Sequence, residues 1–104
     1  MKDVILIIAG ALLCNCIPHL TAGLQGASFP TPFAKPRGIG YSPPLVNFSW
    51  GAFNLAVGLG ILTRYPIALG ANLDCSAMGA GALALGIYLS RHFGKLRNRS
   101  IAAS

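Results

Sequence analysis

The sequence predicts an all-α integral membrane protein, a single domain over residues 1–104 with three transmembrane helices. Of its residues, 54% are hydrophobic and 10% are charged, whereas soluble domains carry about 25% charged residues. Three apolar stretches, at residues 4–24, 45–63 and within 67–90, approach the roughly 20 residues that a helix needs to cross a bilayer. No alternating pattern indicates a β-barrel, and other strands leave backbone groups unpaired in lipid. Helices are therefore the expected spanning elements.

The first span, residues 4–24, contains the polar segment CNCIPHL at residues 14–20. Pro18 lacks an amide hydrogen, so the helix is expected to kink there. Lys2 followed by an apolar run is also typical of a signal peptide, but no small-x-small cleavage site follows, and we expect the segment to be retained.

Two connections separate the spans. Residues 25–44 contain five of the seven prolines and cannot continue a helix, because proline lacks the amide donor and restricts the residue before it. The second connection, RYP at residues 64–66, is very short and predicts a tight hairpin between the second and third helices.

The third helix has two alternative starting points, which give spans of 67–90 or 75–93. In the first alternative Asp74 lies inside the membrane, where a carboxylate is costly and is a functional candidate by default. In the second, Asp74 is the N-cap and its carboxylate binds the free amides at the helix start. The sequence leaves both alternatives open.

Basic residues predict the orientation. With three crossings, the loop at 25–44 and the tail at 91–104 share one side. Six basic residues lie on that side: Lys35, Arg37, Arg91, Lys95, Arg97 and Arg99. The other side holds Lys2 and Arg64. The positive-inside rule therefore predicts a cytoplasmic loop and tail and an external N-terminus, in a bacterial inner membrane. Basic residues beside a span are typical of a stop-transfer flank, so we expect no nucleic-acid binding.

Small residues at four-residue spacing predict close helix packing, because they let backbones approach in lipid. The expected packing residues are Ala52, Ala56 and Gly60 in the second span and Gly79, Gly81 and Gly86 in the third. The third span has more such stripes than two neighbouring helices can cover. We therefore expect a further helix, from a second copy or from a larger membrane-protein complex, to pack against this chain.

Polar residues in the first two spans fall at matching depths. At 1.5 Å per residue, Asn15 and Asn54 are level, and His19 is close in depth to Asn47 and Trp50. These layers predict two polar contacts between the first and second helices. Cys14 and Cys16 face different sides of a helix, and no fourth ligand is evident, so we expect neither a bound metal nor a cofactor.

Two functions fit these features. The first is a structural or accessory subunit of a homo- or hetero-oligomeric membrane complex, and it is preferred because each polar residue then has a structural role. The second is a small oligomeric proton- or ion-coupled transporter or channel, in which Asp74 titrates and Asn15, His19 and Asn54 line the path. An enzyme is less expected, because an acid and a histidine at different depths do not readily meet for acid–base catalysis.

Overall fold

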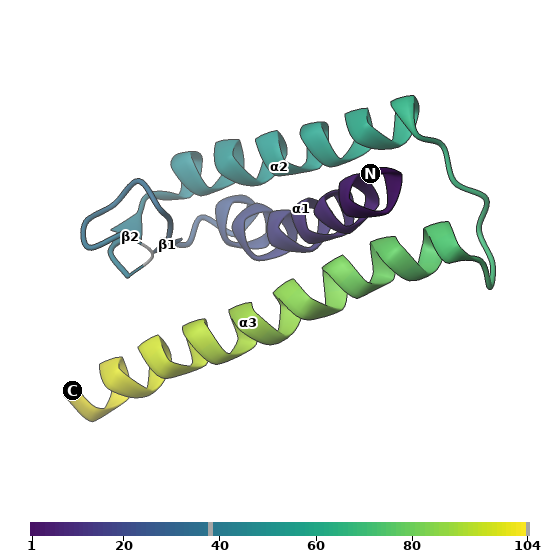
Figure 1. Ribbon diagram of the computed structural model, residues 1–104. Helices are drawn as coiled ribbons and strands as arrows, with labels where there is room; N and C mark the ends of the chain where they lie inside the picture. The colour runs from purple at the N-terminus through teal and green to yellow at the C-terminus, as the bar shows by residue number, and fades with distance from the viewer. Residues whose placement is uncertain (38, 104) are drawn as a thin grey trace.

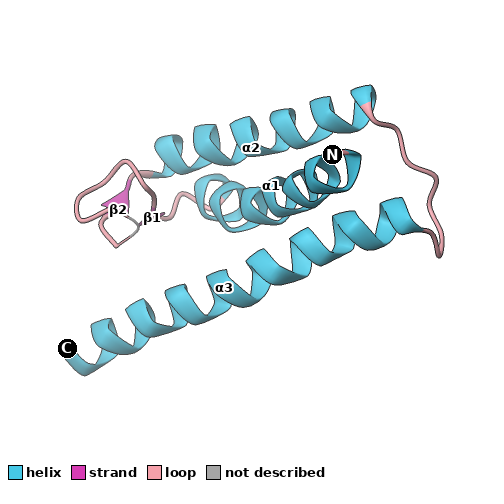
Figure 2. Cartoon of the chain, in the orientation of Figure 1, coloured by secondary structure: helices cyan, strands magenta, loops and turns pink. Residues whose placement is uncertain are grey.

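Three long helices and a short two-stranded ribbon form the protein in the computed structural model, which describes residues 1–37 and 39–103 (Figure 1). The helices are α1 (Lys2–Leu24), α2 (Pro44–Arg64) and α3 (Leu73–Ala103). Strands β1 (Phe29–Pro30) and β2 (Tyr41–Ser42) pair antiparallel in the loop between α1 and α2 (Figure 2). The all-helical prediction is confirmed, because three helices are long and apolar enough to cross a membrane.

Prolines occupy different places in the first two helices. Pro44 is in the first turn of α2 after the N-cap Pro43, where a missing amide hydrogen breaks no helical hydrogen bond. Pro18 lies inside α1, which is assigned as one helix through that position. The kink at Pro18 stays a prediction.

Helix α1 is the central element, and it packs against α2 on one side and α3 on another. The predicted tight hairpin is wrong, because α2 and α3 make no comparable contact with each other within the described residues. The connection between them covers residues 65–72 rather than three residues, and it contains Pro66 and Gly70, the latter at a φ of 139°. This longer connection lets α3 reach α1, alongside which it runs in the same direction (Figure 1).

Glycines mark the closest approach of α1 and α3. A Cβ atom added at Gly81 would collide with the carbonyl oxygen of Ile7, and one added at Gly10 would collide with that of Met78. These carbonyl groups belong to helix backbone and cannot move without a shift of the whole helix. The two helices therefore depend on glycine at both positions.

The contact of α1 with α2 uses another face of α2 than the predicted stripe. Its buried residues are Asn47, Gly51, Asn54 and Gly58. A Cβ atom at Gly51 would lie 2.7 Å from the backbone nitrogen of Leu20, and one at Gly58 would lie 2.7 Å from a methyl carbon of Leu13.

The predicted packing residues divide into two groups. Gly81 lies against α1, and a Cβ at Gly86 would lie 3.6 Å from the Cys14 sulfur. Ala52 is half-buried, whereas Ala56 and Gly60 are exposed. Among the described residues, a Cβ at Gly60 or Gly79 would meet no atom of another segment within 4 Å. The stripe Ala52–Ala56–Gly60 thus remains open on the outside of α2.

Replacing Gly81 by alanine is expected to destabilise the α1–α3 contact, whereas Gly79→Ala is not. Both changes favour the helix by about 1 kcal/mol, but only the Gly81→Ala methyl group collides with backbone, and such overpacking costs about 1–3 kcal/mol. Thermal unfolding in detergent, followed by circular dichroism, compares the two variants. Equal midpoints would contradict the proposed contact.

Candidate functional site

Buried polar side chains gather where the loop meets α1 and α2, namely His19, Thr31, Ser42 and Asn47. Asn54, which lies further along α2, is also buried. Groups of this kind are costly in an apolar environment unless they form hydrogen bonds. No fully enclosed side-chain nitrogen or oxygen of the described residues lacks a partner.

Asn47 is the hub of this network. Its Nδ2 donates hydrogen bonds to the carbonyl oxygens of Phe29 and Ser42, each at 3.0 Å. Carbonyl groups only accept, so these contacts fix the orientation of the amide. Asn47 Oδ1 then faces Nδ1 of His19 at 2.8 Å, and because Oδ1 only accepts, the proton of this bond lies on His19 Nδ1.

The second ring nitrogen of His19 is left free by this arrangement. The side chain is only 2% exposed, and its ring packs edge-on against Phe29 at 5.6 Å between centroids. Its Nε2 has no hydrogen-bond partner among the residues that the structure describes. Every fully enclosed side-chain nitrogen or oxygen of the described residues has a partner. The unpaired Nε2 is therefore not fully enclosed and faces an accessible space. A cavity of about 160 Å³, lined also by Trp50 and Tyr88, adjoins the ring.

The β1–β2 ribbon is held next to this hub by hydroxyl groups. The hydroxyls of Thr31 and Ser42 lie 2.5 Å apart, and both residues are buried. The backbone amide of Phe33 donates to Thr31 Oγ1 at 3.3 Å. Together with Asn47, these contacts give the long, proline-rich loop between α1 and α2 a defined shape.

A second polar contact joins α1 to α2 further along the helices. Asn15 Nδ2 donates to Asn54 Oδ1 at 3.1 Å, and Asn54 Nδ2 donates to the carbonyl oxygen of Trp50 at 2.8 Å. The structure thus contains both polar contacts that the residue depths predict.

Asp74 belongs to the start of α3, and this helix begins at the end of the molecule opposite to the β1–β2 ribbon (Figure 1). It is in the first turn of α3, which begins at Leu73. The capping contact comes from Asn72, whose Oδ1 accepts the backbone amide of Cys75 at 2.9 Å. The Asp74 carboxylate instead forms an ion pair with Lys2 Nζ at 3.0 Å. Of the predicted path residues, the structure brings together Asn15, His19 and Asn54 on α1 and α2, and it separates Asp74 from them.

Sequence reasoning missed several residues of these contacts. Asn72 is a preferred N-cap residue type, so the segment GANLD carried a usable signal for the start of α3. The pairing of Lys2 with Asp74 had no such signal, because it depends on which helix α3 packs against. Thr31 and Ser42 lie in an irregular loop, where no periodicity indicates burial.

Chemically, the site connects the loop to α1 and α2 through hydrogen bonds, and it offers one free acceptor nitrogen, His19 Nε2. Among residues 1–37 and 39–103, no group of three or more His, Cys, Asp or Glu side chains is placed to hold a metal ion. No family model, curated protein or solved structure matches this chain.

Replacing Asn47 by leucine is expected to release the loop. The change leaves two backbone carbonyls and His19 Nδ1 without partners, and each such group costs about 1–3 kcal/mol. Trypsin cleavage after Arg37 measures the effect and should be faster than in the unmodified chain. Asn54→Leu is the matched control, since it removes an interhelical bond of about 0.6 kcal/mol away from the loop. Equal cleavage of both variants would show that Asn47 does not hold the loop.

Proposed function

We propose that this chain is a structural or accessory subunit of a homo- or hetero-oligomeric membrane complex. The observation that supports the proposal is that the polar groups between the helices are paired, whereas most of the outer helix surface is not covered by this chain. The asparagines of α1 and α2 are paired with groups of the same chain, so they need no transported ligand to satisfy them. The spans of α1, α2 and α3 are only 28%, 22% and 6% buried, respectively.

The proposed docking face is the open stripe Ala52–Ala56–Gly60 on α2, with Gly79 of α3 as a second open position. Small residues of this kind favour helix association in lipid because the two backbones approach closely. Gly81 and Gly86 already lie against α1, so they are not part of this face.

The proposed location is a bacterial inner membrane, with the N-terminus outside and the loop and C-terminal tail in the cytoplasm. The grouping of the basic residues supports this orientation. We also propose that α1 bends near Pro18. The Thr21 hydroxyl donates to the carbonyl oxygens of Ile17 and Pro18 at 2.8 Å and 3.0 Å, a pattern that often bends helices.

Isoleucine in place of Ala56 is expected to disrupt assembly, because the larger side chain prevents close approach of a partner helix. Native mass spectrometry in mild detergent measures the mass of the complex, which should fall to that of a monomer. Val57→Ile is the control, since it places isoleucine on another side of the same helix turn. If the unmodified chain and the Ala56→Ile variant are both monomeric, the docking face has no support.

The Asp74→Asn variant separates the accessory function from the alternative of a proton- or ion-coupled transporter. The ion pair with Lys2 is partly exposed, with side chains 51% and 26% accessible, and such pairs contribute about 0–1 kcal/mol. Assembly and thermal stability should therefore be retained, as in the control Asp3→Asn. A proton flux into vesicles that Asp74→Asn abolishes and Asp3→Asn preserves would support transport instead.

A further inference from the structure

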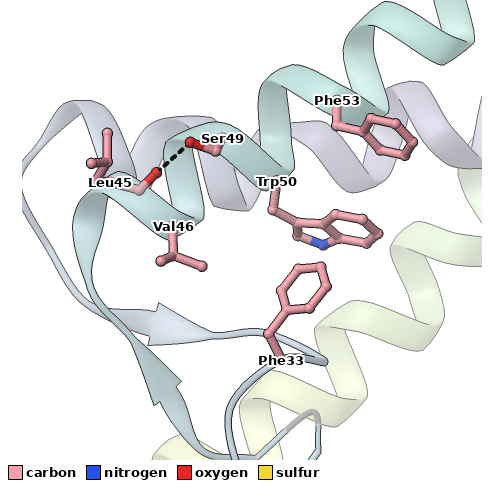
Figure 3. A pocket seen from close by; sticks show the side chains of 6 residues that line it. All are labelled: Phe33, Leu45, Val46, Ser49, Trp50 and Phe53. Carbon is pink, nitrogen blue, oxygen red and sulfur yellow. Dashed lines mark hydrogen bonds between the residues drawn. The ribbon is translucent and has the colours of Figure 1, made fainter.

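An apolar groove lies beside α2 at the end that joins the loop. It has a volume of about 520 Å³ and is lined by Phe33, Leu45, Val46, Ser49, Trp50 and Phe53 (Figure 3). Phe33 comes from the loop, whereas the other five residues lie on the first three turns of α2. The groove is therefore built where a membrane helix meets its interfacial loop.

Aromatic rings form one wall of the groove. Phe33 meets the Trp50 ring edge-on, with centroids 5.0 Å apart, and Trp50 stacks with Phe53 at 5.9 Å. The one hydroxyl in the lining, that of Ser49, donates to the carbonyl oxygen of Leu45 at 2.8 Å. The only other polar group among these six side chains is the indole N–H of Trp50, so the lining is almost entirely apolar and favours a hydrocarbon occupant.

Positive charge lies next to the groove. Phe33 also lines a second depression, together with Pro32, Lys35 and Arg37, and both cations are exposed. The chain has two acidic side chains, Asp3 and Asp74, and each is in the first turn of a helix at the opposite end of the molecule (Figure 1). The acidic side chains of the protein therefore supply no counter-ion at this end.

We propose that the groove and its basic rim bind one anionic phospholipid. An acyl chain lies along Phe33, Trp50 and Phe53, and the phosphate group contacts Lys35 and Arg37. From Leu45 to Phe53 the helix rises about 12 Å at 1.5 Å per residue, close to the roughly 15 Å depth of hydrocarbon in one leaflet. A phospholipid carries both an acyl chain long enough to follow the apolar groove and a phosphate group that can contact the two cations.

Trp50 provides the test, because it is the only tryptophan in the chain and lies in the groove wall. The protein is reconstituted in phosphatidylcholine vesicles that contain a small, equal fraction of dibrominated phosphatidylglycerol or dibrominated phosphatidylcholine. Bromine quenches tryptophan fluorescence on contact. We expect stronger quenching by the phosphatidylglycerol, and a titration of the two lipids gives their relative affinity.

The double variant Lys35→Gln, Arg37→Gln is expected to lose this preference, by about fivefold for each cation removed. The control Arg91→Gln, Lys95→Gln removes the same charge from α3 at the same end of the molecule and should keep the preference. Equal loss in both variants would indicate general surface charge rather than a site. Equal quenching of the unmodified chain by the two lipids would also overturn the proposal. So would the absence of quenching by either lipid, because protein rather than lipid would then cover the groove.

Discussion

The amide of Asn47 is the interaction on which the rest of the structure depends. It satisfies two backbone carbonyls of the loop and one ring nitrogen of α1 from a single position on α2. Backbone groups in an irregular loop have no helical partners, and buried ones need other donors. A side chain with two donor hydrogens and an acceptor oxygen can meet those needs in three directions at once.

Helix packing depends on a different property, the absence of side chains. Hydrophobic exclusion gives little attraction between helices in lipid, so close backbone contact has to supply it. Gly10 and Gly81 allow this contact between α1 and α3, and Gly51 and Gly58 allow it between α1 and α2. Polar hydrogen bonds then set the register of α1 and α2, while α3 has the ion pair of Asp74 with Lys2 at its first turn.

The sequence predicted the three helices well, because hydropathy over about 20 residues is a strong signal. It also predicted the contact of Asn15 with Asn54, and it placed His19 in one polar layer with Asn47 and Trp50, since depth along a helix follows directly from residue number. It did not show which of these two residues pairs with His19. It did not predict which face of α2 meets α1, because Gly51 and Gly58 are as small as the residues of the stripe Ala52–Ala56–Gly60. Nor did it predict the position of α3, since the length of a connection does not determine which helix the next one packs against.

The place of α1 between its two neighbours has a consequence for biosynthesis. Every hydrogen bond of the Asn47 network and of the Asn15–Asn54 contact involves residues 15–54. These contacts can form before the ribosome has made α3, which starts at Leu73. The last helix then meets an already assembled pair, and its arrival requires no rearrangement of the polar contacts between the first two.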